Sequence, residues 1–481
     1  MDFRPILFVI GILLTILAAG MCVPALVDAA AGHPDWTVFA VAAAVTLFFG
    51  VALVLSCRTP RIRISVRQAF VLTTLSWVAI TVFAALPFHF SDLELGYTDA
   101  FFEAMSGVTT TGSTVIKDLD TAPPGILLWR ALLQWLGGLG IIVMAISVLP
   151  MLGVGGMQMF RVEAFETGEK MMPRAAQISA ALSIIYLVLT AACAAALWAA
   201  GMTFFDAVCH AMTTLATGGF STRDASVGYY DSASIDAIIT VGMIAGGLPF
   251  VLYLKTVQGE ALAFSADSQV RWYLGFAAIS VAVTAALLWV DAGFSGGAAV
   301  RYAAFNVISI MTGTGFATDD FWLWGAFAGP IFFYLMFIGG CTGSTSCGIK
   351  IFRFQVLWAA TVTQFHHLLR PHGVFIPYYN HRPIPGEVIT SVLSFFLLYG
   401  VCFALLAVGL GMLGLDYTTA ISGAATAISN VGPGLGPVIG PAGNFATLPD
   451  AAKWLLSVGM LLGRLELFTV LMLLTPALWR G

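Results

Sequence analysis

The chain has 481 residues, of which 59% are hydrophobic and only 10% are charged, and its mean hydropathy is +0.93. Soluble domains carry roughly 25% charged residues, so this composition excludes a soluble protein and indicates a chain that lies in lipid. The formal net charge is −4, and no nucleic-acid partner is expected.

Apolar stretches long enough to cross a membrane recur along the whole chain, since a ~30 Å hydrocarbon layer takes ~20 helical residues. The first stretch is too long for the core of a signal peptide and a second follows directly, so it is expected to remain in the membrane. The sequence therefore predicts an all-α, multi-pass membrane protein with ten spans, at 6–27, 36–57, 69–90, 125–149, 179–200, 237–254, 272–290, 325–349, 388–413 and 454–478.

Charged residues divide the loops into two kinds. Basic residues follow every second span, and the positive-inside rule makes these loops, and with them both termini, cytoplasmic. The opposite loops are rich in Asp and Glu, so the outer face is expected to attract cations. The basic residues are Arg58, Arg61, Arg63, Arg67, Arg161, Lys170, Arg174, Lys255, Arg271, Lys350, Arg353, Arg370 and Arg382.

A semi-polar stretch too short to span the membrane follows the third, fifth, seventh and ninth spans. Each ends in a Thr/Gly-rich run: VTTTGST at 108–114, LATGGFS at 215–221, MTGTGFA at 311–317 and ISNVGPG at 428–434. When the runs are aligned without gaps on one glycine each, an Ala stands twelve residues earlier and a Ser or Thr six residues earlier in all four. We call these the anchor glycines: Gly112, Gly219, Gly315 and Gly432.

The shared register predicts a unit of span, short helix, loop and span that occurs four times. The expected organisation is an N-terminal hairpin at 1–60, then repeats at 61–165, 166–265, 266–383 and 384–481, the third with a broken helix. In the second short helix, His210 stands where Glu103 stands in the first, and it is expected to pack behind its loop.

Four such loops that converge on one axis have the chemistry of a cation pathway. Irregular backbone at membrane depth is tolerated where it lines a water-filled cavity, and glycine reaches φ > 0 without a steric penalty. Backbone carbonyls and threonine hydroxyls can then replace the hydration shell of K⁺. The alternative is that small residues only let helices pack closely. The expected filter residues are Thr110, Thr111, Gly112, Thr217, Gly218, Gly219, Gly313, Thr314, Gly315, Asn430, Val431 and Gly432.

At these loops, and in the stretches 132–141 (LLQWLGGLGI), 149–158 (LPMLGVGGMQ) and 216–224 (ATGGFSTRD), the chain resembles the TrkH/TrkG and KtrB potassium-uptake proteins of the Trk/Ktr/HKT superfamily. The resemblance covers the whole chain. It implies a K⁺-channel-like pore within one subunit of a homodimer in the bacterial inner membrane. It also implies a cytosolic TrkA-type nucleotide-binding ring as partner, and a preference for K⁺ because Gly112 is not replaced by Ser.

The same resemblance implies a gating role for a loop and for one arginine. The glycine-rich run 339–348 interrupts the eighth span, as an intramembrane gating loop does, and its expected gate residues are Gly339, Gly340, Gly343, Ser344, Thr345 and Gly348. Arg464 lies within the last span, where a buried charge is costly and usually faces a cavity. The resemblance makes it a barrier to cations under the filter. The alternative is a structural ion pair, although Glu466, two residues on, does not share its helix face.

Other functions compete with a gated K⁺ pathway. Symport of K⁺ with H⁺ or Na⁺ would need intramembrane carboxylates, for which Glu466 is the candidate, and a Na⁺-permeable member of the superfamily is a further alternative. An enzyme would need a catalytic constellation at membrane depth, such as paired Asp, HExxH or GxSxG near polar partners, and the predicted spans show no such constellation. K⁺ is thus expected as the transported ion, with no organic cofactor.

Overall fold

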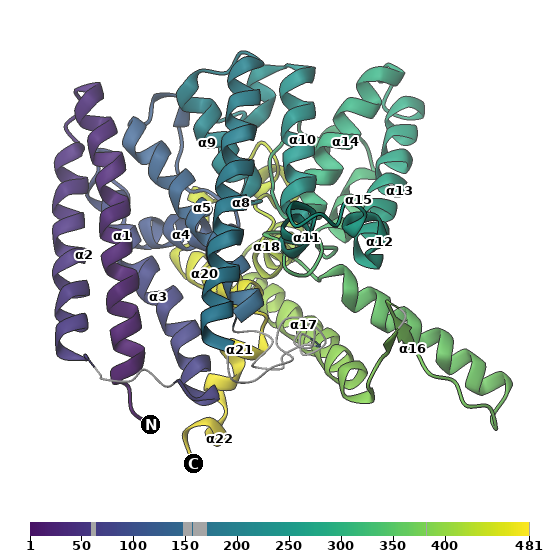
Figure 1. The fold of residues 1–481 in the computed structure, drawn as a ribbon. Helices are drawn as coiled ribbons and strands as arrows, with labels where there is room; N and C mark the ends of the chain where they lie inside the picture. The colour runs from purple at the N-terminus through teal and green to yellow at the C-terminus, as the bar shows by residue number, and fades with distance from the viewer. Residues whose placement is uncertain (59–63, 148–155, 157–170, 381, 481) are drawn as a thin grey trace.

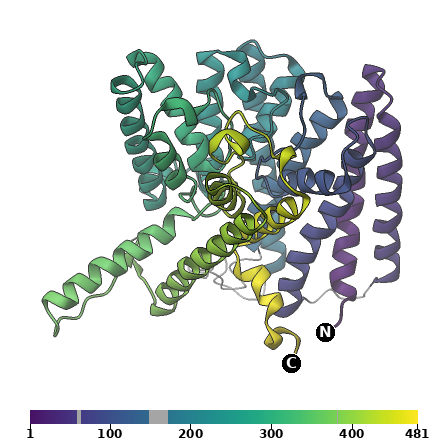
Figure 2. The ribbon, with the colours of Figure 1, turned by 180° about the vertical axis from the view of Figure 1, so that it is seen from behind.

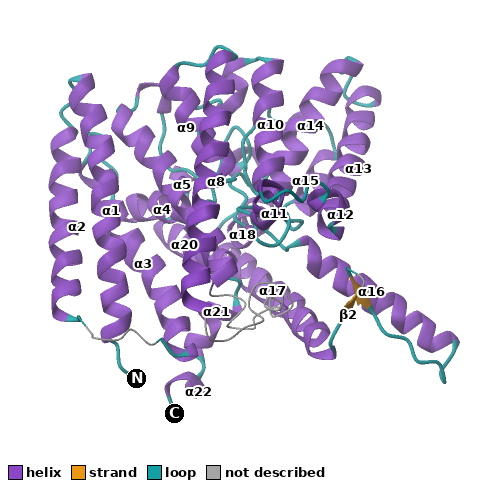
Figure 3. Ribbon diagram, in the orientation of Figure 1, coloured by secondary structure: helices purple, strands orange, loops and turns teal. Residues whose placement is uncertain are grey.

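The computed structural model describes residues 1–58, 64–147, 156, 171–380 and 382–480. Arg61, Arg63, Arg161 and Lys170 lie outside the described residues, as does most of the 149–158 motif. The described part is almost entirely helical (Figure 3), apart from one antiparallel strand pair, β1 (Tyr378–Tyr379) and β2 (Arg382–Pro383).

An N-terminal hairpin and four three-helix units make up the bundle. The hairpin is α1 (Arg4–Ala31) and α2 (Trp36–Ser56). The first and second units are α3 (Val66–Phe90), α4 (Tyr97–Val108) and α5 (Pro124–Ser147), then α8 (Met171–Ala199), α9 (Phe204–Leu215) and α10 (Ala233–Gly247). The third and fourth units are α13 (Ser268–Val290), α14 (Gly296–Thr312) and α15 (Ala328–Leu335), then α17 (Gly386–Met412), α18 (Tyr417–Ser429) and α20 (Asp450–Arg464). Connecting and terminal helices are α11 (Phe250–Val257), α12 (Ala263–Ala266), α16 (Ile351–Leu369), α19 (Gly436–Ile439), α21 (Phe468–Leu471) and α22 (Pro476–Trp479).

The units are arranged in a circle. In each unit the short middle helix (α4, α9, α14 or α18) packs between the two helices that flank it in the sequence. The last helix of one unit also packs on the short helix of the next: α5 on α9, α10 on α14, and α20 on α4. Because α20 returns to α4, the fourth unit lies beside the first, and loops lie inside the bundle near α10 and α18 as well as at its ends (Figure 3).

The helices that are able to span a membrane agree in part with the ten spans predicted from the sequence. Seven helices among the described residues are long and apolar enough to span, and two bent pairs would raise the number to nine. One bent pair, α10 and α11, turns by 92°. The bend falls where Pro249 follows Gly246 and Gly247, because proline has no N–H to continue the helix. The other, from α20 into 468–474, turns by 108° where Glu466 and Leu467 have positive φ.

The expected eighth span, 325–349, is helical over Ala328–Leu335 and then leaves the helix. We call residues 336–350 the broken-helix loop. Its glycines favour turns over helix, and its N–H groups and hydroxyls bond to the ends of three short helices, as described below. Beyond the loop, α16 extends away from the bundle (Figures 1 and 2).

The hairpin lies at one side of the molecule, and both termini lie at the same end of it (Figure 1). The two helices of the hairpin touch through glycines, with an ideal Cβ on Gly11 only 2.8 Å from the carbonyl oxygen of Gly50. Small residues let helices approach this closely without a hydrophobic driving force between them in lipid.

This contact makes Gly50 sensitive to a single methyl group. An ideal Cβ there would lie 2.8 Å from Thr15 Oγ1 and 3.0 Å from the Gly11 carbonyl oxygen, so Gly50→Ala must push α1 and α2 apart. We expect a loss of about 1–3 kcal/mol in the free energy of unfolding, measured as a lowered melting temperature in detergent. The matched control is Gly400→Ala on α17, where the new Cβ meets no atom within 4 Å and no loss is expected. Equal melting temperatures for the two variants would contradict the glycine contact.

Candidate functional site

The four short helices end in the same way, just before the anchor glycines. Two residues before each anchor the backbone is left-handed, with φ of 52° at Thr110, 48° at Thr217, 73° at Gly313 and 53° at Asn430. The next N–H then bonds five residues back: Thr111 to Ser106 (2.8 Å), Gly218 to Thr213 (2.9 Å), Thr314 to Ser309 (2.8 Å) and Val431 to Thr426 (3.1 Å). This is the bond of a Schellman helix end. The sequence alignment on the anchors therefore corresponds to one shared backbone structure.

Two of these left-handed positions, Thr110 and Thr217, carry side chains that resist the conformation, whereas Asn430 is of a type that adopts it readily. Glycine is the usual residue here, yet only the third loop has one; Thr110 and Thr217 are β-branched, for which φ > 0 is a true outlier. Such strain costs of order 1–3 kcal/mol per residue and persists where surrounding contacts dictate it, commonly at functional sites.

The anchor glycines close the loops into a ring. All four have positive φ: 91° at Gly112, 78° at Gly219, 83° at Gly315 and 108° at Gly432. An ideal Cβ on any anchor would come within 3.0 Å of the carbonyl oxygen that precedes the next anchor. The oxygens belong, in order, to Gly218, Thr314, Val431 and Thr111. The contacts run from the first unit through the fourth and back to the first, so each loop abuts two neighbours.

Side chains reinforce the seam between the fourth and first loops. Ser113 Oγ donates to the Gly432 carbonyl (2.7 Å), and Asn430 Nδ2 donates to Thr111 Oγ1 (2.9 Å). In each loop φ is positive two residues before the anchor, not at the residue between, and again at the anchor. Residues with positive φ and residues without it therefore alternate along each loop, and the alternation is the same in all four.

A cavity of about 70 Å³ adjoins the ring and is lined by all four anchor glycines. Its wall also includes Arg130, Arg223 and Asp224. The ring is therefore reached from this side through a small, polar vestibule that the four units share.

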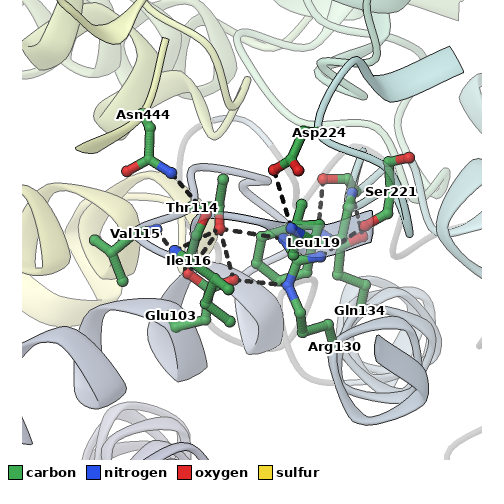
Figure 4. A network of polar contacts seen from close by, with 12 residues as sticks. Glu103, Thr114, Val115, Ile116, Leu119, Arg130, Gln134, Ser221, Asp224 and Asn444 are labelled. Atoms are coloured by element: carbon green, nitrogen blue, oxygen red, sulfur yellow. Dashed lines mark hydrogen bonds and ion pairs between the residues drawn. The ribbon is translucent and has the colours of Figure 1, made fainter. Parts of the chain in front are cut away.

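Behind the first loop lies a buried ion pair (Figure 4). Arg130, on α5, places Nε 2.8 Å from Glu103 Oε1, and both side chains are at most 2% exposed. The same guanidinium donates to the Ser221 carbonyl (2.6 Å) in the second loop and lies 4.1 Å from the centre of the Phe220 ring. Glu103 in turn accepts from Thr114 Oγ1 (3.0 Å). One pair of charges thus holds the first and second loops together.

Further bonds in Figure 4 tie the segment after the first loop to two other units. The N–H of Leu119 donates to Asp224 Oδ1 of the second unit (3.1 Å). Asn444 Nδ2, from the fourth unit, donates to the Ile116 carbonyl (2.6 Å).

Each short helix carries a polar side chain that braces its own loop. His210, fully buried as expected, places Nε2 2.9 Å from Ser221 Oγ. At the same register in the third unit, Asn306 Nδ2 donates to Thr318 Oγ1 (2.7 Å). In the fourth unit this register holds Gly423, and the neighbouring Ser422 accepts from the Leu435 N–H instead (2.9 Å).

The broken-helix loop lies against the C-terminal ends of three short helices. Thr345 Oγ1 donates to the Leu215 carbonyl of α9 (2.9 Å), and Ser346 Oγ donates to the Thr312 carbonyl of α14 (2.7 Å). The Gly348 N–H donates to the Ser429 carbonyl of α18 (3.0 Å). Of the other expected gate residues, Ser344 is buried, Gly339 and Gly340 are tightly packed, and Gly343 has no atom within 4 Å of an added Cβ.

Arg464 contacts this loop directly and is only 4% exposed. Its Nη1 donates to the Thr345 carbonyl (3.1 Å) and to Cys347 Sγ (2.8 Å), while Nη2 lies 3.3 Å from the Gly137 carbonyl. A second, smaller cavity of about 20 Å³ is lined by Arg464, Cys347 and Asn430 together with Lys350 and Glu466. Arg464 thus shares this cavity with Asn430, which lies two residues before an anchor glycine.

The ion pair of Glu466 is made with a different arginine. Glu466 Oε2 lies 2.5 Å from Nη2 of Arg353, at the start of α16, and no ion pair joins Glu466 to Arg464 within the described residues. Lys350, the last residue of the broken-helix loop, donates to the Ser346 carbonyl. Arg464 is thus directed toward the loop and not toward Glu466.

Several residues of the site were missed in the sequence. Arg130 and Gln134 lie in the middle of an otherwise apolar span, and Arg353, which the charge pattern assigns to a cytoplasmic loop, has a side chain that is 0% exposed. A polar side chain inside a predicted span is a functional candidate by default, so Arg130 and Gln134 could have been singled out. The threonine hydroxyls expected as free ligands are partly engaged, since Thr314 Oγ1 lies 2.7 Å from Thr312 Oγ1.

Comparisons with known proteins agree with this architecture. The family model for TrkH, described as a cation transport protein, matches residues 36–479. The Trk system potassium uptake protein TrkI of Halomonas elongata is 47% identical, over 99% of this chain and 97% of that protein. The Trk system potassium uptake protein TrkH of Escherichia coli K12 is 38% identical over the full length of both.

Among solved structures, the crystal structure of the potassium transporter TrkH from Vibrio parahaemolyticus matches with a TM-score of 0.93. It is 37% identical, and the match covers 100% of both chains. The relatives are named as transporters and not as enzymes. The chain therefore belongs to the TrkH family of cation transport proteins.

Proposed function

We propose that this chain takes up K⁺ across the bacterial cytoplasmic membrane and that the four loops form its selectivity filter. The observation that carries the proposal is the closed ring in which each anchor glycine abuts the carbonyl before the next anchor. The relatives are named potassium uptake proteins or a potassium transporter, which supports K⁺ as the ion.

The proposed ligands are the carbonyls of the two residues before each anchor, with the anchors themselves closing the ring. Four short helices direct their C-terminal ends at this point, and the negative end of a helix dipole favours a cation there. The proposed filter residues are Thr110, Thr111, Gly112, Thr217, Gly218, Gly219, Gly313, Thr314, Gly315, Asn430, Val431 and Gly432.

The proposed gate is the broken-helix loop together with Arg464. Three bonds to the ends of α9, α14 and α18 hold the loop under the ring, and Arg464 holds it from the fourth unit. These bonds must break before a cation can leave. The proposed gate residues are Gly339, Gly340, Gly343, Ser344, Thr345 and Gly348, with Arg464 as an electrostatic barrier.

The proposal also covers the orientation of the chain in the membrane and its protein partners. We place both termini, which lie at the same end of the molecule (Figure 1), in the cytoplasm, where the basic loops belong. Inward flux is then driven by ~2.3 kcal/mol per charge per 100 mV of membrane potential. The family resemblance further supports a homodimer with ten spans per chain, carried on a TrkA-type ring.

Symport remains the competing mechanism, although Glu466, its candidate proton site, is paired with Arg353 at 2.5 Å. Purified protein in liposomes separates the two, because a channel conducts K⁺ with no proton or sodium gradient. K⁺ flux that strictly needs such a gradient would establish symport instead, and no flux under any gradient would refute transport.

The filter is tested by Gly112→Ser. The new side chain would collide with the Gly218 carbonyl, and φ of 91° is strained for serine. We expect the K⁺ over Na⁺ permeability ratio to fall by about tenfold or more, measured from reversal potentials in liposomes. The control is Gly96→Ser before α4, where nothing lies within 4 Å of the added Cβ and selectivity is expected to stay unchanged. An unchanged ratio in Gly112→Ser would place the filter elsewhere.

The gate is tested by Arg464→Ala. Removal of a buried positive charge and of two bonds to the broken-helix loop lowers the barrier to K⁺, so basal K⁺ flux is expected to rise severalfold. The measurement is ⁸⁶Rb⁺ uptake into liposomes that hold equal amounts of folded protein. Arg480→Ala, an exposed arginine near the C-terminus, serves as the control. A fall in flux would contradict the barrier role.

A further inference from the structure

We infer that Gln134 is a positioning residue of the filter, and that its amide sets K⁺ preference by fixing the second loop within the ring. This inference rests on the proposed function of the loops. Gln134 lies on α5 in the first unit, is 0% exposed, and reaches across to the second unit (Figure 4).

The amide of Gln134 binds the second loop on both sides of its anchor glycine. Its Nε2 donates to the Gly218 carbonyl (2.6 Å), and its Oε1 accepts from the Phe220 N–H (3.0 Å). The two bonds straddle Gly219. A side-chain amide that pairs with one carbonyl and one N–H acts as a short piece of neighbouring strand, and it leaves the loop little freedom to rotate.

This contact explains why the second loop has two consecutive glycines. Gly218 is not among the residues with positive φ, so its backbone conformation does not require glycine. An ideal Cβ on Gly218 would, however, come within 3.0 Å of the Gln134 amide carbon, oxygen and nitrogen. Glycine is needed at 218 because Gln134 occupies the place of its side chain.

The other three loops have a β-branched residue at this register, one residue before the anchor glycine. Contacts of that side chain hold the loop in place. Thr111 Oγ1 lies 2.7 Å from Thr109 Oγ1, and Thr314 Oγ1 lies 2.7 Å from Thr312 Oγ1. Val431 is fully buried in an apolar cluster. In the second loop the missing side chain is supplied by Gln134 from the neighbouring unit.

The consequence for ion selection lies in the Gly218 carbonyl. The Gly218 oxygen is one of the four carbonyl oxygens that abut an anchor glycine. Among the described residues, it is the only one of these four that accepts a hydrogen bond from a side chain. The donor sets the direction of the carbonyl and keeps it from collapsing inward. A carbonyl that can move inward also accommodates the smaller Na⁺, so a fixed carbonyl favours K⁺.

The test is Gln134→Leu, which keeps the volume but cannot bond to either backbone group. We expect the K⁺ over Na⁺ permeability ratio, measured from reversal potentials of purified protein in liposomes, to fall roughly tenfold. The matched control is Trp135→Phe, the next residue on α5. It removes the bond from Trp135 Nε1 to Thr190 Oγ1 (3.1 Å), which lies away from the loops, and selectivity is expected to stay at the wild-type value.

A second variant tests the same contact from the loop and leaves α5 unchanged. In Gly218→Ala the new methyl group displaces the Gln134 amide, so the same loss of K⁺ preference is expected even where Gln134→Leu does not fold. Melting temperatures of all variants identify those that fold.

The outcomes distinguish this inference from the proposal on which it rests. Wild-type protein that shows no K⁺-selective flux would overturn the proposed function. A selective wild type, with a folded Gln134→Leu or Gly218→Ala of unchanged ratio, would overturn the positioning role alone. Loss of selectivity in Trp135→Phe to the same extent would show a general effect of weakening α5, and would also overturn it.

Discussion

The structure depends on the closure of four backbone loops into one ring, in which each anchor glycine abuts the carbonyl of the next loop. A Cβ at any of the four anchors would come within 3.0 Å of that carbonyl, so the ring exists only because four separate positions of one chain lack a side chain. Unlike a tetramer of identical subunits, the ring is built from four different sequences. A different set of side chains therefore holds each loop in place. The four loops share the backbone conformation of the helix end, and they differ in the side chain that bonds to it.

The loops are buried inside the bundle, where an unpartnered polar group is costly, so most polar groups around them are paired within the protein. The face of α5 that carries Arg130, Gln134 and Gly137 meets much of this need for the first two loops. Burial of the Arg130 and Glu103 charges carries a large desolvation penalty, which their mutual attraction offsets only when further hydrogen bonds complete the geometry. The Ser221 carbonyl and Thr114 supply such bonds. A charged pair at this place fixes the position of two loops with one rigid, planar guanidinium.

The third unit departs from the other three at one position. In the first, second and fourth units a glycine of the last helix, Gly137, Gly246 or Gly463, lets that helix pass closely over the end of its short helix. In the third unit the helix is broken at the corresponding depth and the broken-helix loop takes its place, with hydroxyls that bond to the ends of α9 and α14. A helix satisfies its own backbone hydrogen bonds, whereas the broken-helix loop is held by hydrogen bonds to neighbouring units. This difference in the third unit is the reason why we propose the broken-helix loop as the gate.

The sequence by itself determined the membrane class, the N-terminal hairpin, the four short helices and the register of the anchor glycines. These features are local: apolar length, glycine at one fixed spacing, and helix ends that each unit forms from its own residues. The sequence also separated Arg464 from Glu466, because two residues on one helix do not share a face. Only the tertiary structure decided which loops touch, that two expected spans bend sharply, that Arg353 pairs with Glu466, and that Gln134 fills the space beside Gly218. The bends are local, but apolar length alone does not distinguish a bent span from a straight one. The other three features join residues that lie far apart in the sequence, and a sequence pattern does not specify the distances between such residues.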